Sequence, residues 1–439
     1  TWRGVVPRHL RGGPFRYRPG MISGPADIDR VAARGGPDHI SRMRSLTVLL
    51  AAAVAACAPA ASNLTPVDDW TGPPGSRTPF LAPTADGGLL LTWFEPRGDT
   101  AFALQIARRD QESWSQPLTV ASHRPFFVNW ADFPSAVETS TGAWVVHWLE
   151  KAGNSAYAYH VMLTRSENRG QTWSTPVVAH QDLSPTEHGF VAMVPDSAGG
   201  VAVAWLDGGR MVDSGGSMTV RHATFTAAGL PINEQVLDPR TCECCQVTMA
   251  RAAGGLVVAY RDRSETEVRD IAVVREVNGA WSAPISVADD GWVIRACPVN
   301  GPSIAADREG VAVAWYTGAN ETPRVRLAFS GDGGASFGPP LTLDDGKPLG
   351  RVYLQLTAPA RAVAVWLEDG DSLATWRLRR VDASGRVEPS SSLATTDRGR
   401  RAGFARTALA GDNLYLTWAD PGSSPAESRV RVVRAALSR

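Results

Sequence analysis

The sequence predicts an all-β fold in which similar four-stranded units repeat around a common axis. Short runs with a large aromatic residue two positions before their end recur seven times, with 51 to 57 residues from one aromatic to the next. Around each run, apolar and polar residues alternate with period two, which is typical of strands. The chain also contains 42 Gly and 31 Pro, which suits many tight turns. A unit of about 50 residues with four strands has the size of one β-propeller blade.

The seven runs share a turn with Gly or Asp, three or four β-forming residues and then the aromatic. They span Leu89–Glu95, Trp144–Glu150, Val201–Asp207, Leu256–Asp262, Val311–Thr317, Ala362–Glu368 and Leu414–Asp420. Their aromatic residues are Trp93, Trp148, Trp205, Tyr260, Trp315, Trp366 and Trp418. In the fifth unit the four predicted strands are Pro302–Ala306, Val311–Thr317, Arg324–Phe329 and Pro340–Leu343. Seven blades are therefore predicted, with six as the alternative if one unit is degenerate.

The two ends of the repeat predict how the ring closes. The seventh unit stops after its third strand, Arg429–Ala436, while the strand-like segment Leu64–Trp70 precedes the first complete unit. We expect that segment to supply the missing fourth strand, which would remove the free edges of the sheet.

The segment before the repeat predicts export. Met43 and Arg44 precede an apolar run from Leu46 to Ala56, whose 11 residues fall short of the roughly 20 needed to span a bilayer. Small residues directly before Cys57 resemble a bacterial lipobox. We therefore expect an upstream leader at 1–42, a lipoprotein signal peptide at 43–56, a lipid anchor and closing strand at 57–74, and the propeller at 75–439. The alternative is an ordinary secretory signal with an incidental cysteine.

Charge limits the classes of partner. Lys and Arg together number 44, as do Asp and Glu, so there is no basic excess to neutralise the phosphates of a nucleic acid. We expect no nucleic-acid binding, membrane contact through the lipid anchor alone, and a monomer. The expected location is the cell envelope, at the outer membrane or its periplasmic face.

Two turns carry a recognisable signature. Ser166-Glu-Asn-Arg-Gly-Gln-Thr-Trp173 and Ser330-Gly-Asp-Gly-Gly-Ala-Ser-Phe337 resemble the Asp-box of sialidase-like propellers, and the first has Asn168 at the acidic position. We interpret these turns as folding devices, because Ser and Asp side chains bond turn backbone groups and Gly permits positive φ. The resemblance implies the propeller fold and leaves the reaction open.

Loops that enter the innermost strand and leave the second strand converge on one end of a propeller, where ligands usually bind. The resemblance implies three arginines around a sugar carboxylate and an aspartate acid/base. Arg77, in Arg77-Thr78-Pro79, matches the first arginine. Arg351 and one of Arg261, Arg263 and Arg269 are candidate partners, Asp132 is the candidate acid/base and Glu187 could assist it. The tyrosine nucleophile of sialidases has no clear match.

Other residues of the same loops are candidate ligand-binding groups. Trp130 could stack on a sugar face. The remaining candidates offer polar or charged side chains: Asp207, Arg210, Asp262 and Asn300.

Four of the five cysteines lie in entry loops of the fourth and fifth units: Cys242, Cys244, Cys245 and Cys297. In an oxidising envelope they could form disulfides. Alternatively they could bind a soft metal ion, Zn or Cu, with His188 as an added ligand.

Two functions follow from these observations. The first is an exported lipoprotein with glycoside hydrolase activity of exo-sialidase type, acting on an anionic glycan at the channel mouth. The alternative is a non-catalytic envelope module that binds a glycan, a small anionic ligand, a metal or a protein partner near the cysteines.

Overall fold

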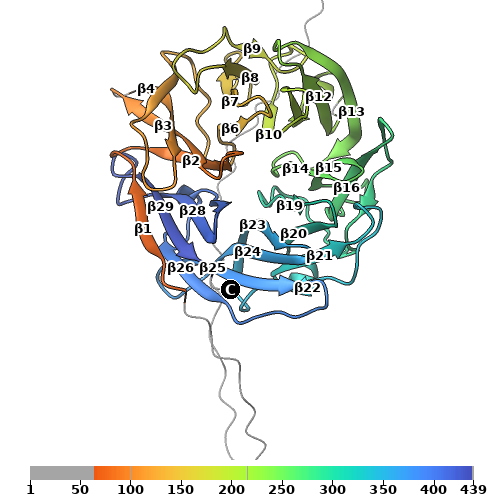
Figure 1. Cartoon of the computed structure of the whole chain (residues 1–439). Coiled ribbons are helices and arrows are strands. Elements are labelled where there is room, and N and C mark those ends of the chain that lie inside the picture. Colours follow the sequence, from red (N-terminus) through yellow and green to blue (C-terminus); the bar gives the residue numbers. More distant parts are fainter. Residues whose placement is uncertain (1–63, 99, 215, 438–439) are drawn as a thin grey trace, which may run out of the picture. The chain divides into compact units, whose positions relative to one another are not determined.

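The structure, a computed structural model, describes residues 64–437 except 99 and 215. These residues form seven antiparallel sheets arranged as a β-propeller (Figure 1). The predicted fold class is thus confirmed, with seven blades and not six. The predicted signal peptide and the lipidated Cys57 lie outside the described residues. Within the described part of the chain, no helix is long and apolar enough to cross a bilayer.

The strands follow one another along the chain from the innermost to the outermost position of each blade, except that the outermost strand of blade 7 comes first in the chain. Blade 1 contains β2 (Arg77–Pro83), β3 (Leu89–Arg97), β4 (Ala101–Arg109) and β5 (Leu118–Ser122). Blade 2 contains β6 (Ser135–Glu138), β7 (Trp144–Lys151), β8 (Tyr159–Ser166) and β9 (Val177–Val178). Blade 3 contains β10 (His188–Pro195), β11 (Val201–Asp207), β12 (Met218–Phe225) and β13 (Pro231–Thr241). Blade 4 contains β14 (Thr248–Ala252), β15 (Gly255–Arg261), β16 (Ile271–Val277) and two short outer strands, β17 (Ala280–Trp281) and β18 (Ile285–Ser286).

Blade 5 contains β19 (Ser303–Ala306), β20 (Val311–Thr317), β21 (Arg324–Ser330) and β22 (Leu341–Thr342). Blade 6 contains β23 (Pro348–Ala358), β24 (Arg361–Glu368), β25 (Ala374–Asp382) and β26 (Ser391–Thr396). Blade 7 contains β27 (Arg406–Ala410), β28 (Asn413–Asp420), β29 (Arg429–Ala436) and β1 (Val67–Thr71). Three short helices lie between strands: α1 (Gly209–Ser214), η1 (Ala319–Glu321) and η2 (Arg400–Ala402). The fifth-unit strands agree with their predicted bounds to within one residue at each end.

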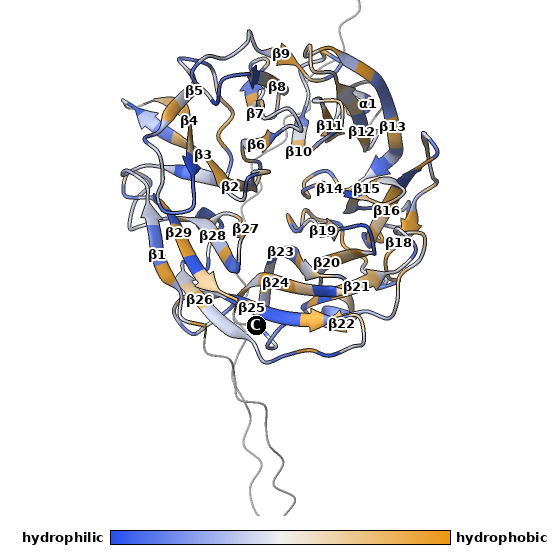
Figure 2. Cartoon of the chain, in the orientation of Figure 1, coloured by the Kyte–Doolittle hydropathy of each residue, from blue (hydrophilic) through white to orange (hydrophobic). Residues whose placement is uncertain are grey.

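The ring closes as the sequence predicts. β1 pairs antiparallel with β29, with Val67 opposite Arg434 and Thr71 opposite Arg431. The first described strand therefore completes the last blade and covers an edge that would otherwise be open to other chains. Figure 2 shows hydrophobic and hydrophilic positions interspersed along the strands of the ring.

The recurring aromatic residues are wedges between neighbouring sheets. All seven lie on the second strand of a blade and are at most 2% exposed. In three blades the indole N–H donates to the carboxylate two residues further along, from Trp148 to Glu150, Trp205 to Asp207 and Trp366 to Glu368. In these three blades the acidic residue after the aromatic supplies the acceptor that a buried indole needs.

The two signature turns have the same hydrogen-bond pattern. Ser166 Oγ accepts from Gly170 N–H at 2.8 Å, and Ser330 Oγ accepts from Gly334 N–H at 2.8 Å. Both glycines have positive φ, 84° and 85°. Asn168 Oδ1 accepts the N–H of Thr172, so the amide replaces the carboxylate without changing this contact. The turns are therefore folding devices in the described structure.

Candidate functional site

Inner strands of several blades enter the channel through a bulge. The pairing register shifts between Arg77 and Phe80 in blade 1, between Gly189 and Ala192 in blade 3, and between Gly350 and Tyr353 in blade 6. Inside these bulges Thr78, Phe190 and Arg351 have φ of 49°, 54° and 54°. Positive φ is uncommon for such residues and costs energy, so the surrounding structure must impose it. Bulges of this kind re-aim side chains and often lie next to active sites.

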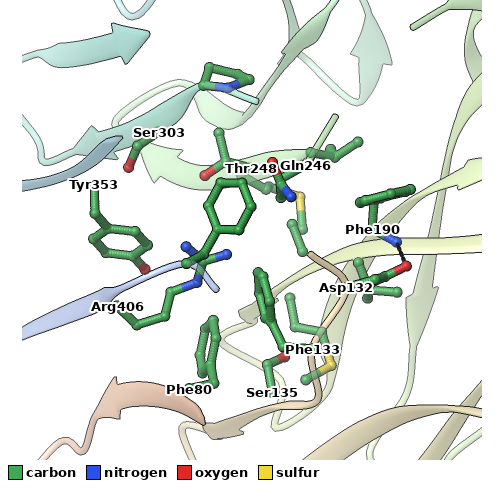
Figure 3. Close-up of a pocket in the computed structure, with 17 residues that line it drawn as sticks. Phe80, Asp132, Phe133, Ser135, Phe190, Gln246, Thr248, Ser303, Tyr353 and Arg406 are labelled. Carbon is green, nitrogen blue, oxygen red and sulfur yellow. Dashed lines mark hydrogen bonds between the residues drawn. The ribbon is translucent and has the colours of Figure 1, made fainter. Parts of the chain in front are cut away.

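A cavity of about 100 Å³ lies where the inner strands meet (Figure 3). Its walls come from the inner strands of all seven blades and from the loops between them, and polar side chains are placed among aromatic rings. The labelled lining residues are Phe80, Asp132, Phe133, Ser135, Phe190, Gln246, Thr248, Ser303, Tyr353 and Arg406. A second pocket of about 230 Å³ at the mouth shares Phe133 and Phe404 with the first. The two pockets are therefore adjacent.

Arg406 is the cation of this cavity, and the sequence interpretation missed it. It begins β27, is 6% exposed, and has its guanidinium carbon 3.8 Å from the centre of the Phe133 ring. Nη1 donates to the carbonyl of Ala405, whereas Nε has no hydrogen-bond partner among the described residues. Burial lowers the pKa of Arg406 to about 10, opposed by Tyr353 and Asp132, so it stays charged at neutral pH. A buried guanidinium with free donors is a receptor for an anion.

Asp132 and Glu187, predicted as acid/base and assistant, are brought together. Burial raises the pKa of Asp132 to about 8, and the Glu187 carboxyl adds to the rise, while the Phe190 N–H and Arg406 oppose it. Burial also raises the pKa of Glu187 to about 7, opposed by the hydroxyl of Tyr159. Two neighbouring carboxyls with raised pKa values can exchange a proton near neutral pH, as general acid/base chemistry requires.

Tyr159 and Gly189 hold this carboxyl pair in place. The Tyr159 hydroxyl donates to Glu187 Oε1 at 3.4 Å, and its ring stacks on Phe127 at 4.0 Å. Asp132 Oδ2 accepts the Phe190 N–H at 2.8 Å. A Cβ at Gly189 would lie 2.2 Å from Asp132 Oδ2 and 2.9 Å from the Tyr159 ring, so glycine is required there. The sequence interpretation passed over Tyr159, because it lies on a third strand and not in an entry loop.

The predicted arginines are distributed differently from the expectation. Arg77 lies at the mouth pocket, where Nε donates to Gly75 O and Nη2 to Pro425 O. Arg351 donates to the carbonyls of Gly403 and Gly399, both at 2.9 Å, and its pKa is lowered to about 10 by burial. Arg351 thus joins blade 6 to the loop before blade 7, which leaves little of its guanidinium for a ligand.

The arginines of 261–269 are also bonded within the protein. Arg261 is 1% exposed and donates to the carbonyls of Asn300, Arg269 and Tyr316. Arg263 and Arg269 share the carboxylates of Glu243 and Glu267. The structure therefore does not bring these groups and Arg351 together around an open carboxylate position, as the resemblance implied.

The remaining predicted ligand-binding residues have varied surroundings. Trp130 lines the mouth pocket, under the guanidinium of Arg351 at 5.4 Å. Asn300 Oδ1 accepts the N–H of Arg351, so it is part of the scaffold. Asp262 is half-buried, and burial raises its pKa to about 6. Arg210 is exposed on α1, and Asp207 is buried beside His188.

The cysteines form one disulfide and one dithiol. Cys244 is bonded to Cys297, whereas Cys242 and Cys245 are free and buried, with their sulfurs 3.4 Å apart. The Cys245 thiol lowers the pKa of Cys242 to about 6, assisted by the N–H of Cys244 and by Arg261 and Arg269, against burial. The disulfide excludes a metal site that uses all four sulfurs. Among the described residues, His188 lies against carboxylates, histidines and backbone carbonyls and not against these cysteines.

Comparisons with known proteins agree with the fold. No family model matches the sequence, and no curated protein matches it. Among solved structures, the polysaccharide lyase Uly1 is similar with a TM-score of 0.51 and 9% identity, over 82% of this chain and 90% of that one. The α-L-arabinanase of Penicillium chrysogenum, complexed with arabinobiose, has a TM-score of 0.47 and 12% identity, over 85% of this chain and 99% of that one.

A mutant of the NanB sialidase from Streptococcus pneumoniae has a TM-score of 0.43 and 12% identity, over 82% of this chain and 68% of that one. At these identities the likeness concerns the propeller fold and not the reaction.

Proposed function

We propose that this protein acts on glycans, as a glycoside hydrolase for an anionic sugar chain. The observation that carries the proposal is a pair of neighbouring carboxyls, Asp132 in the wall of the cavity and Glu187 next to it, with pKa values raised to about 8 and 7. The lyase, arabinanase and sialidase named above support the choice of substrate class, since all are propellers whose names describe activity on glycans or glycosides.

In the proposed reaction Asp132 holds a proton near pH 7.5 and Glu187 is largely ionised. Asp132 donates this proton to the glycosidic oxygen as the bond to the anomeric carbon breaks. Glu187 takes a proton from the water whose oxygen bonds to that carbon. Arg406 would bind the anionic group of the sugar, and Trp130 at the mouth would stack on a sugar face.

This arrangement modifies the sialidase-type expectation. Arg351 and Arg261 are bonded to backbone carbonyls, so Arg406 takes the carboxylate-binding role in the proposal, with Arg77 at the mouth. The cavity around Arg406 measures about 100 Å³, below the roughly 300–1,000 Å³ of typical ligand sites. We therefore propose that only the anionic group and the adjoining glycosidic oxygen enter it, beside Arg406 and Asp132, while the rest of the sugar lies in the mouth pocket.

The test is turnover of fluorogenic sialosides, uronides and arabinosides. Asp132→Asn and Glu187→Gln should each lower kcat about 100-fold or more, because general acid/base groups contribute on the order of 10² to 10⁴. The rate of the native protein should rise through pH 7 and fall above pH 8. Arg406→Met should raise KM for anionic substrates more than for neutral ones.

Asp289→Asn, at an exposed position, is the matched control and should leave turnover unchanged. A folded protein without turnover on any of these substrates would contradict the proposal, as would full activity in both carboxyl variants.

The cysteines favour a second candidate function, binding of a soft metal ion by Cys242 and Cys245. Their sulfurs are 3.4 Å apart, and Arg269 Nη1 lies 3.3 Å from Cys242 Sγ, which favours the thiolate that such an ion requires. Native mass spectrometry should then find one Zn²⁺ or Cu⁺ that is lost in Cys245→Ser. A protein with two disulfides and no ion would refute this function.

We also propose that the protein is exported and attached to the envelope through Cys57. The disulfide between Cys244 and Cys297 supports this, because disulfides persist in oxidising compartments. Metabolic labelling with palmitate should mark the protein and fail to mark Cys57→Ser. Equal labelling of both would refute lipidation at this cysteine.

A further inference from the structure

A second polar cluster lies at the start of blade 3, where His188 directly follows Glu187 of the carboxyl pair. It consists of Asp182 in the preceding loop, His188 at the start of β10 and Asp207 at the end of β11. His188 Nε2 lies 3.8 Å from Asp182 Oδ2 and 3.7 Å from Asp207 Oδ2. We infer that these three side chains form a binding site for a divalent transition-metal ion such as Zn²⁺.

The hydrogen bonds of His188 leave a lone pair directed into the cluster. Nδ1 donates to the carbonyls of Tyr159 at 3.1 Å and Thr186 at 3.2 Å, so the neutral ring carries its lone pair on Nε2. His188 is fully buried, and Nε2 has no hydrogen-bond partner among the described residues. A lone pair facing two carboxylate oxygens is repulsive unless a proton or a metal ion lies between them. Metal-binding histidines typically donate their other N–H to a carbonyl in this way.

The donor spacing suits a shared ion better than direct hydrogen bonds. Separations of 3.7 and 3.8 Å are too long for hydrogen bonds, which have a donor–acceptor distance of about 3 Å. Two ligands about 2.1 Å from a tetrahedral metal lie about 3.4 Å apart, so a contraction of a few tenths of an ångström would complete the site. One imidazole and two carboxylates favour Zn²⁺ or a similar ion over Ca²⁺ or Mg²⁺.

The surrounding backbone is built to keep the two carboxylates side by side. A Cβ at Gly209 would lie 1.7 Å from Asp182 Oδ2 and 3.2 Å from Asp207 Oδ1, so no other residue fits at this position without moving them. Ser184 N–H donates to Asp182 Oδ1, and Gly209 N–H donates to Asp207 Oδ1. Oδ1 of each aspartate is thus held by a backbone N–H, while Oδ2 faces His188.

Neighbouring charges leave room for a cation. The guanidinium of Arg221 lies 3.4 Å from Asp207 and 2.9 Å from Glu234, so one positive charge is shared by two carboxylates. The carboxylate of Asp182 adds a third negative charge, which leaves the cluster with an excess of negative charge. The Asp182 side chain is 27% exposed, which gives an ion a path from solvent. His180 stacks on His188 at 4.0 Å, but both its ring nitrogens face backbone partners, so it supports the site without being a ligand.

The experiment measures binding of Co²⁺ and Zn²⁺ to the chelator-treated, full-length protein. All variants are made in a Cys245→Ser background, which removes the other candidate site. In that background one equivalent should bind, and the Co²⁺ spectrum should lack sulfur-to-metal charge-transfer absorption. Asp182→Asn should weaken binding at least tenfold, and His188→Gln should abolish it. His123→Gln and Asp289→Asn, at exposed positions, are matched controls that should bind like the native protein.

Asp182→Asn keeps the test decisive if His188→Gln does not fold, because Asp182 is partly exposed and an amide can still accept the Ser184 N–H. The inference is overturned if no ion binds, if Asp182→Asn binds as tightly as the native protein, or if the bound Co²⁺ shows thiolate absorption. None of these results depends on glycoside turnover, so the inference and the proposed function fail separately.

Discussion

Arg261 and Arg406 have similar burial but opposite surroundings. Arg261, 1% exposed at the end of β15, donates to three backbone carbonyls, whereas Arg406, 6% exposed at the start of β27, donates to one and lies among aromatic rings. The first arginine satisfies the backbone of two blades, and the second retains donors that face a cavity. The difference shows that burial alone does not distinguish a scaffold cation from a binding cation, whereas the inventory of hydrogen-bond partners does.

The same substitution at both positions should separate the two roles most clearly. Arg261→Met would leave three buried carbonyls without donors and should lower the free energy of unfolding by about 3–5 kcal/mol. Arg406→Met removes a buried charge that has few hydrogen-bond partners, so it should change the free energy of unfolding by about 1 kcal/mol or less. Chemical denaturation of both variants measures the difference.

Arg386→Met is the control, since the Arg386 side chain is 69% exposed and should contribute little. Equal losses of stability at 261 and 406 would show that the bonds to carbonyls do not set the two arginines apart.

The carboxyl pair provides the next comparison, through pH. Asp132 has a pKa of about 8 in the folded protein and about 3.9 when unfolded, so the folded state binds the extra proton between these values. Stability from this group is therefore complete below pH 4 and is lost as the pH rises to 8, by at most about 1.4 kcal/mol per pH unit. In Asp132→Asn this loss is absent.

The advantage of Asp132→Asn over the native protein should accordingly grow from pH 4 to pH 8 and then level off. Thermal unfolding across this range measures it, and the amide can still accept the Phe190 N–H. A constant difference at all pH values would mean that Asp132 is ionised in the folded protein at neutral pH.

Much of the fold could be predicted from the sequence because its signal is periodic. The regular spacing of Trp93, Trp148 and their counterparts indicates one buried aromatic residue per blade. The last unit has only three strands of its own, which predicts that β1 pairs with it. These features depend on local alternation and repeat length, which a single sequence shows directly. They required no knowledge of contacts between distant residues.

The candidate site was predictable only where loop position was enough. Asp132 and Glu187 were found because both lie in entry loops that converge. The role of Arg351 was not visible, since it depends on the carbonyls of Gly399 and Gly403, some 50 residues away. Arg406 was overlooked for the opposite reason, because an arginine that begins an apolar strand shows no pattern until Phe133 and Tyr353 surround it.

The two signature turns provide the smallest expected effect and a contrast with Asp132. The carboxylate of Asp332 accepts hydrogen bonds from the hydroxyls of Ser336 and Ser330, and these bonds lower its pKa to about 2. Asn168 occupies the equivalent position with an uncharged amide. A carboxylate is thus stabilised in one turn, whereas burial disfavours it at the channel.

Exchanging the two residues should test whether the turn itself determines this preference. Asn168→Asp should raise the melting temperature by about 1 °C at pH 7, and Asp332→Asn should lower it by a similar amount, since surface turns contribute little. Because the folded pKa of Asp332 is depressed, its contribution is present above about pH 4 and is lost as the pH falls toward 2. Thermal unfolding at pH 7 and pH 3 should show both effects shrinking in acid. If Asn168→Asp instead destabilised the protein at pH 7, the first turn would differ from the second in more than its acidic position, and the amide would be the residue that its donors require.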